Sequence, residues 1–124
     1  MMLICSVALA QSDKDVVAKA RHVDAKGAAF MVKKDPKIVI LDIRTPGEFK
    51  DGHIKDAKNI DYRSDKFEDQ IGKLDRSKTY VVHCASGGRS GRSLAVFQKL
   101  KFGNIIHLDG GYRGWVKEGL PVEK

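Results

Sequence analysis

Three short apolar runs, rich in β-branched residues, constrain the fold of this chain more than any other feature of its sequence. They occupy residues 38–41, 80–82 and 105–108. Runs this short and this apolar are typical of strands buried on both faces, as in a parallel sheet. Stretches with helical character alternate with them, at residues 25–33 behind Asp24 as a candidate N-cap, at 64–74 and at 89–100. The alternation predicts an α/β fold with a central, mainly parallel sheet and helices on both faces.

The length of 124 residues suits one compact domain, which we expect over residues 21–124. Residues 1–20 are then a separate segment, a signal-peptide remnant followed by a lead-in in which residues 11–21 could form a loosely attached helix. No apolar run approaches the length needed to cross a bilayer, so the sequence excludes an integral membrane protein.

The first ten residues end in Ala8-Leu9-Ala10, the small-x-small pattern that a signal peptidase recognises. This pattern predicts cleavage before Gln11, loss of Cys5 with the leader, and a periplasmic or otherwise exported protein. The segment lacks a basic start and is shorter than the roughly 15 residues of a secretory leader. The alternative is an apolar tail on a cytoplasmic protein.

The net charge of +7 is concentrated in residues 76–108, which hold six lysines and arginines and no acidic residue. The positive electrostatic field of these side chains attracts small anions or anionic partners, although a solvated helix face explains the run of charges equally well. Aromatic residues make up only 7% of the chain and are spread thinly, which argues against a nucleic-acid partner. The two cysteines are far apart, no C-x-x-C is present and the histidines are scattered, so we expect no metal site.

The run at residues 80–82 leads into a segment that combines a cysteine, a glycine pair and an arginine at the start of a helix. It reads His83-Cys84-Ala85-Ser86-Gly87-Gly88-Arg89. Glycines let backbone N–H groups converge, and the helix N-terminus adds positive potential, so the segment predicts an anion cradle that stabilises a Cys84 thiolate. Ligands of α/β folds bind beyond the carboxyl ends of strands, so we expect Cys84 to stay open to substrate. The alternative is a small buried cysteine that only fills space.

Three separated motifs in this order resemble the rhodanese family of sulfurtransferases, in its small single-domain form. The first covers residues 41–49 and continues through Gly52-His53-Ile54, Ala57 and Asn59-Ile60; the second is the cysteine segment. The third is Leu108-Asp109-Gly110-Gly111-Tyr112, with Trp115 and residues 119–122. Together they span nearly the whole predicted domain, which makes the resemblance specific.

The resemblance implies a single rhodanese-like domain in which Cys84 is the catalytic sulfur carrier. Its thiolate would take a sulfane sulfur from a small anionic donor (thiosulfate, a persulfide or polysulfide) and pass it to a thiol, cyanide or a thioredoxin-like acceptor. The substrate-binding residues would be Ala85, Ser86, Gly87, Gly88 and Arg89, whose backbone N–H groups surround the sulfur. The resemblance implies no external cofactor, no nucleic acid, no membrane and a monomer.

Asp42 and Arg44 lie in the first motif and would brace the cysteine segment, although a purely structural ion pair explains them equally well. The Arg89 side chain would either anchor the segment or meet the anionic end of the donor. Ala85 stands where thiosulfate-using members often carry a basic residue. This departure argues against thiosulfate as the physiological donor, although Arg89, Arg92 and the positive field of the region remain, and it makes protein persulfides or polysulfide alternative donors.

Two other functions remain in view. A cysteine-dependent phosphatase needs five residues between cysteine and arginine, whereas four separate Cys84 from Arg89. A non-catalytic interaction module of the same family commonly lacks the cysteine or the loop glycines, and this chain has both. Of the remaining residues, Gly110 and Gly111 are expected to form a turn, and Trp115 to anchor the core.

Overall fold

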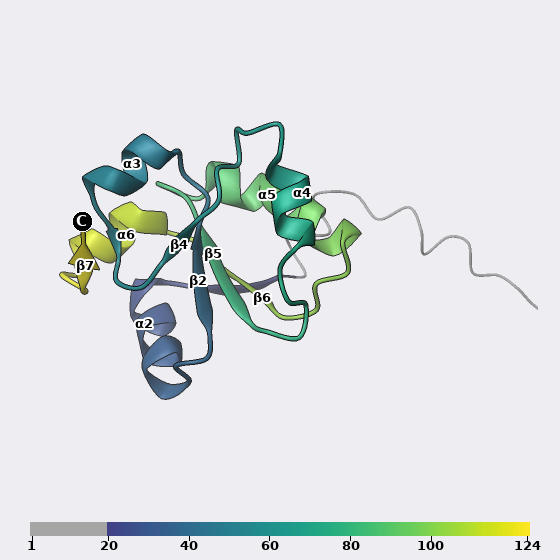
Figure 1. Ribbon diagram of the computed structural model, residues 1–124. Coiled ribbons are helices and arrows are strands. Elements are labelled where there is room, and N and C mark those ends of the chain that lie inside the picture. The colour runs from purple at the N-terminus through teal and green to yellow at the C-terminus, as the bar shows by residue number, and fades with distance from the viewer. Residues whose placement is uncertain (1–19) are drawn as a thin grey trace, which may run out of the picture.

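Five strands form one parallel sheet in the order β1-β6-β5-β2-β4 (Figure 1). The structure is a computed structural model and describes residues 20–124. The strands are β1 (Arg21–Val23), β2 (Val39–Asp42), β4 (Lys58–Asn59), β5 (Tyr80–His83) and β6 (Ile105–Leu108). The predicted apolar runs supply β2, β5 and β6, the three central strands, because a strand with neighbours on both sides and helices over both faces must be apolar throughout. The α/β fold with a parallel sheet is confirmed.

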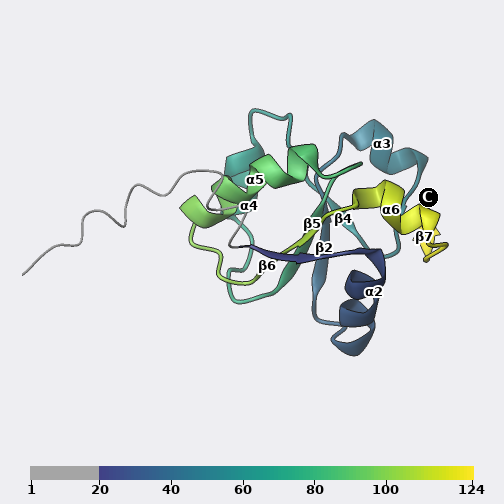
Figure 2. The same ribbon diagram turned by 180° about the vertical axis from the view of Figure 1, so that it is seen from behind.

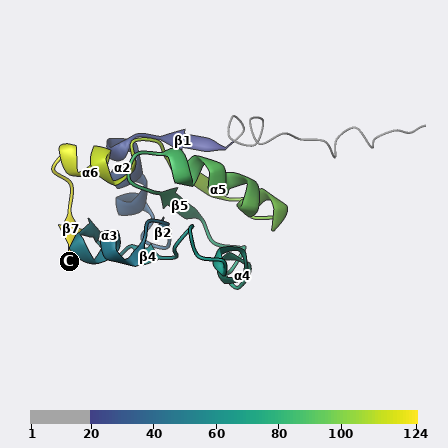
Figure 3. The same cartoon turned by 90° about the horizontal axis from the view of Figure 1, so that it is seen from above.

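Helices cover both faces of this sheet, as the views from behind and above show (Figure 2 and Figure 3). On one face, α4 (Phe67–Gly72) and α5 (Gly88–Lys99) pack on Leu41 and Val82. On the other, α2 (Ala25–Lys34) and α6 (Gly111–Lys117) pack on Ile40, Val81 and Ile106. Neighbouring residues of one strand therefore serve two different cores, as the pleat of a strand requires.

The three predicted helices are present, and one of them is several residues shorter than predicted. The α2 helix begins after Asp24, whose carboxylate accepts a hydrogen bond from the Gly27 N–H at 2.8 Å, as an N-cap does. The helix expected over residues 64–74 is shorter and comprises α4 alone. Ser64 belongs to a preceding turn, in which its N–H bonds the Asp61 carbonyl and its hydroxyl accepts from the Lys66 N–H.

Two helices were not anticipated. One is α6, whose first residue, Gly111, was expected to lie in a turn; the other is α3 (Pro46–Asp51). The α3 helix starts with a capping box, in which Thr45 and Glu48 bond each other's backbone N–H groups, and has proline at its first position. This signal was present in the sequence. The α3 helix leads into β3 (His53–Ile54), which pairs antiparallel with β7 (Val122–Glu123) outside the main sheet.

The expected leader, its cleavage site and most of the lead-in helix over residues 11–21 lie outside the described residues. The prediction of helix is wrong for residue 21, because Arg21 lies in β1 and pairs with Ile106 of β6. The β6 strand offers an unpaired edge there, and strand pairing satisfies the backbone groups of residues 21–23. Within residues 20–124, no helix has the length and apolar character that a bilayer crossing requires.

Candidate active site

Cys84 follows directly after β5, at the carboxyl edge of the sheet, where the chain turns into α5. Its exposed fraction is only 1%, so the expectation of an open cysteine is wrong for the sulfur itself. The reason is that α6 packs on the segment: the Tyr112 N–H bonds the Cys84 carbonyl at 2.8 Å, and the Arg113 N–H bonds the Ala85 carbonyl at 3.0 Å. The neighbouring Ser86 and Gly88 are exposed, so the rim of the segment faces solvent.

Three hydrogen-bond donors surround the sulfur of Cys84. The Gly87 N–H lies at 3.2 Å, the Ser90 N–H at 3.4 Å and the Ser90 hydroxyl at 3.3 Å. Burial raises the pKa of the Cys84 thiol, but the bonds from Ser90, Gly87 and Ser86 outweigh it and leave the pKa below its ordinary value. The segment therefore favours the thiolate, which is the nucleophilic form of cysteine.

Two glycines allow the cysteine segment to touch the turn after β6, backbone against backbone. Gly87 has a φ of 111°, and a Cβ there would lie 2.6 Å from the Asp109 carbonyl oxygen. Gly111 has a φ of 62°, and its Cβ would lie 2.6 Å from the Ala85 carbonyl oxygen. Both positions combine a left-handed backbone with a contact that no side chain fits. The glycines of two separate motifs thus serve one interface.

The Arg89 side chain pairs with Glu48 of α3. The two guanidinium nitrogens lie 2.8 and 3.0 Å from the two carboxylate oxygens, a bidentate geometry. This hydrogen-bonded pair is the main reason why the pKa of Glu48 falls to about 2. Of the two roles expected for Arg89, the structure places its side chain in the anchoring one, where it ties the start of α5 to α3.

Asp42 and Arg44 form a buried ion pair beside the start of the cysteine segment, because Asp42 lies opposite His83 in the β2–β5 pair and its carboxylate is 3.8 Å from His83 Nε2. The Arg44 guanidinium bonds Asp42 at 2.6 and 2.9 Å and the Gly52 carbonyl at 2.8 Å. It also lies over the Tyr112 ring, 4.1 Å from its centre. Since the Tyr112 N–H bonds the Cys84 carbonyl, the pair supports the segment from below and contributes no atom to the sulfur's surroundings.

A chain of polar side chains, not anticipated from the sequence, continues from the sulfur. The Ser90 hydroxyl lies 2.7 Å from His107 Nε2, and His107 Nδ1 lies 2.7 Å from an oxygen of Asp109. His22 Nδ1 lies 2.5 Å from the same oxygen. His22 and His107 are far apart in sequence but directly opposite each other in the β1–β6 pair. Predicting which residues of β1 and β6 lie opposite each other would have brought these two histidines together.

The spacing of these groups is that of hydrogen bonds. Within residues 20–124, His22, His107 and Asp109 are the one group of His, Cys, Asp or Glu side chains close enough together to share an ion. Two ligands of a tetrahedral zinc lie about 3.3 Å apart, whereas the Asp109 oxygen is 2.5 and 2.7 Å from the two nitrogens. We therefore describe them as a hydrogen-bonded cluster.

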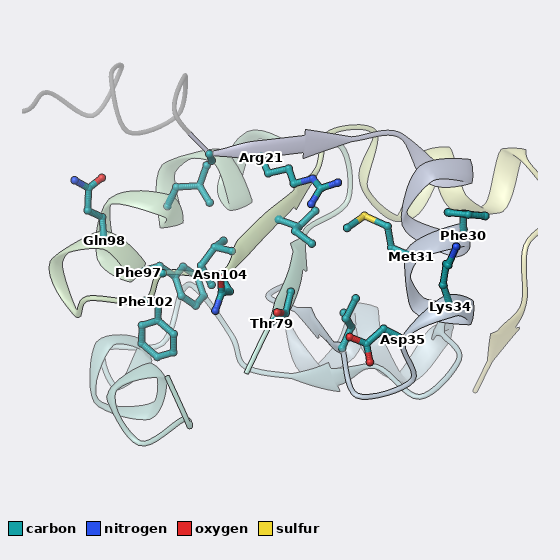
Figure 4. Close-up of a pocket in the computed structure, with 16 residues that line it drawn as sticks. Arg21, Phe30, Met31, Lys34, Asp35, Thr79, Phe97, Gln98, Phe102 and Asn104 are labelled. Carbon is teal, nitrogen blue, oxygen red and sulfur yellow. The ribbon is translucent and has the colours of Figure 1, made fainter. Parts of the chain in front are cut away.

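A cavity of about 630 Å³ lies at the opposite end of the sheet (Figure 4). Its lining includes Arg21, Thr79 and Asn104, which stand at or just before the amino ends of β1, β5 and β6, together with Met31 and Phe97. No cysteine or histidine lines it. Cys84 follows the carboxyl end of β5, so this cavity supplies no group to the chemistry of the sulfur.

Comparison with known proteins identifies the family of this chain. Residues 25–118 match the family model described as a Rhodanese-like domain. The chain belongs to this family. The match covers β2, β5 and β6, the cysteine segment and α6, so it contains every residue of the site around Cys84 except His22 of β1.

Relatives of this rhodanese-like domain include small sulfurtransferases. It is 26% identical to a sulfurtransferase of Allochromatium vinosum, over 82% of this chain and 92% of that protein. It is 35% identical to the thiosulfate:glutathione sulfurtransferase of Saccharomyces cerevisiae, over 70% of each chain. The crystal structure of a rhodanese-related protein from Thermoplasma volcanium superimposes with a TM-score of 0.73 at 31% identity, over 83% of this chain and 97% of that one.

Proposed function

We propose that this rhodanese-like domain is a sulfurtransferase that carries sulfur as a persulfide on Cys84. The observation that carries the proposal is the surroundings of the Cys84 sulfur, where two N–H groups and a hydroxyl converge at 3.2 to 3.4 Å. A thiolate held by preorganised donors is a nucleophile at neutral pH, and its product, a persulfide anion, carries the same charge. The sulfurtransferase relatives support the proposal.

The reaction is a two-step exchange. In the first step the Cys84 thiolate attacks the outer sulfur of the donor; a bond from Sγ to that sulfur forms, and the donor's S–S bond breaks. The electron pair leaves with the rest of the donor, as sulfite from thiosulfate or as a thiolate from a persulfide. In the second step an acceptor thiolate or cyanide attacks the outer sulfur, and the electron pair returns to Cys84. The exposed rim at Ser86 and Gly88 is where we place donor and acceptor.

The residues around the sulfur favour a persulfide or polysulfide donor. Ala85 supplies no charge, and Arg89 is already paired with Glu48. Thiosulfate carries two negative charges and gains most from a free cation beside the sulfur. The name of the yeast relative includes thiosulfate and glutathione, so both belong in the assay, thiosulfate as a donor and glutathione as an acceptor.

The geometry gives less support to the two alternatives. A phosphatase loop uses its arginine to bind the phosphate. Arg89 lies one residue closer to Cys84 than that loop requires, and both of its terminal guanidinium nitrogens donate to Glu48. A module that only binds partners has no need of a cysteine whose pKa is lowered by its surroundings.

The proposal is tested by mass spectrometry after incubation with a sulfane donor, using the full chain with Cys5→Ser so that Cys84 is the single thiol. We expect one added sulfur, about 32 Da, which disappears when cyanide or glutathione is added. The double variant Cys5→Ser/Cys84→Ser is the matched control and should gain no sulfur. An unmodified Cys84 with every donor, or equal transfer rates in the two variants, would refute the proposal.

A further inference from the structure

We propose that His107, oriented by Asp109 and acting through Ser90, accepts the proton of the Cys84 thiol. The inference rests on the proposed function, in which Cys84 must ionise before it attacks. It gives roles to His107 and Asp109, which the sulfur-transfer steps above leave without one, and a second role to the Ser90 hydroxyl.

The need for an acceptor follows from burial. Cys84 and Ser90 are 1% and 0% exposed, so the thiol has very little contact with solvent. The Ser90 hydroxyl touches the sulfur at 3.3 Å and His107 Nε2 at 2.7 Å. His107 Nδ1 then bonds Asp109, whose side chain is 54% exposed. The sulfur is thus linked to the surface by an unbroken line of hydrogen bonds.

Each proton along this line of hydrogen bonds can be followed before and after Cys84 ionises. In the neutral state the Cys84 S–H donates to Ser90, the Ser90 O–H donates to His107 Nε2, and His107 Nδ1–H donates to the Asp109 carboxylate. Ionisation moves two protons by one place each, from Cys84 to Ser90 and from Ser90 to His107. Afterwards His107 is an imidazolium and Ser90 is again a hydroxyl. The two hydrogen bonds of Ser90 are kept with their direction reversed, because Ser90 now donates to the thiolate and accepts from His107 Nε2, while His107 Nδ1–H still donates to Asp109.

Asp109 has the properties that this role requires. Burial raises the pKa of its carboxyl, but hydrogen bonds from His22 and His107 outweigh the effect and lower it, so the group is a carboxylate at neutral pH. A carboxylate on Nδ1 fixes the tautomer that leaves Nε2 free to accept, and it stabilises the imidazolium once formed.

Two other titratable side chains, His22 and His83, face His107. His22 approaches from β1 with ring centres 5.3 Å apart and bonds the same Asp109 oxygen, so it competes with His107 for the carboxylate. His83 approaches from β5, but burial lowers its pKa, and its ring bonds the Cys84 carbonyl and not the sulfur. Only His107 is joined to the thiol through a hydroxyl that can both give and take a proton.

The test measures ionisation of Cys84 directly, from the ultraviolet absorbance of the thiolate against pH, in the Cys5→Ser background. His107→Gln keeps a polar group near Ser90 but cannot take a proton. We expect its midpoint to rise by about one pH unit or more, toward the free-thiol value of about 8.5. His53→Gln is the matched control, because His53 is also buried but bonds the Phe49 carbonyl, and the midpoint of this variant should match that of the parent.

Asp109→Asn provides a second variant at an exposed position that tolerates substitution, and it should raise the midpoint in the same direction by a smaller amount. If His107→Gln fails to fold by circular dichroism, this variant decides. A parental midpoint in a folded His107→Gln, or in Asp109→Asn when it alone is folded, would overturn the relay. Because the titration needs no sulfur donor, it is independent of the mass experiment: a missing persulfide refutes sulfur transfer, whereas an unmoved midpoint refutes the relay.

Discussion

At Cys84, direct hydrogen bonds stabilise the thiolate, as the sequence predicted for the backbone N–H groups of the segment. The arginine of the segment, Arg89, is instead paired with Glu48 at 2.8 Å. The groups that remain are uncharged donors in direct contact with the sulfur. The thiolate is thus favoured by uncharged donors in direct contact, whereas the attraction of a dianionic donor depends on charges farther from the sulfur, such as Arg92 beside Gly88. Nucleophilicity and donor choice therefore rest on different residues.

Ala85→Arg tests this separation. The new guanidinium lies beside the sulfur on a half-buried position, so we expect kcat/KM for thiosulfate to rise several-fold while that for an uncharged persulfide donor changes little. The gain should shrink as salt is added, because salt screens the attraction. Ala85→Gln is the control for side-chain size. Equal changes for both donors would mean that position 85 does not set donor choice.

Among the helices and strands, those with local signals were predictable and those built on distant contacts were not. The apolar runs predicted the central strands, Asp24 marked the start of α2, and the capping box at Thr45 would have revealed α3. The Arg89–Glu48 pair and the Ser90–His107 contact join residues 41 and 17 positions apart. Their partners come from different elements, so only the packed fold brings them together. The burial of Cys84 was missed for the same reason, because α6 covers it.

The contact between α6 and the cysteine segment can be tested with two glycines of the same helix. Gly111→Ala places a methyl 2.6 Å from the Ala85 carbonyl oxygen at a φ of 62°, so we expect a loss of about 2 kcal/mol or more in unfolding free energy. Gly114→Ala meets nothing within 4 Å and should be neutral or stabilising by up to about 1 kcal/mol. Urea denaturation measures both, and equal effects would contradict this account of the contact.

For the domain as a whole, the buried His83 predicts how stability depends on pH. Burial is the main reason why the pKa of His83 is lowered, and its Nε2 has no hydrogen-bond partner. Below the ordinary histidine value of about 6.5 the unfolded chain binds a proton that the folded one does not, so unfolding becomes easier as pH falls. Glu48 acts in the same direction only below about 4.5, since its folded pKa is about 2.

We therefore expect the unfolding free energy to fall by about 1 kcal/mol between pH about 7 and 5.5, measured by urea denaturation. The comparison is the slope of stability against pH in His83→Gln, which should be flatter whatever its absolute stability. A slope as steep as that of the parent would assign the acid sensitivity to other groups.

The packing of α6 against the Cys84 and Ala85 carbonyls also has a consequence for biosynthesis. The ribosome adds Cys84 well before it adds His107, Asp109 and Gly111, and domains acquire structure as their elements emerge. Until β6 and α6 have left the exit tunnel, the new thiol lacks the backbone that closes over it and the histidine joined to Ser90. A nascent chain therefore carries an ordinary cysteine, and reactivity toward sulfur donors begins only when folding brings these later residues into place.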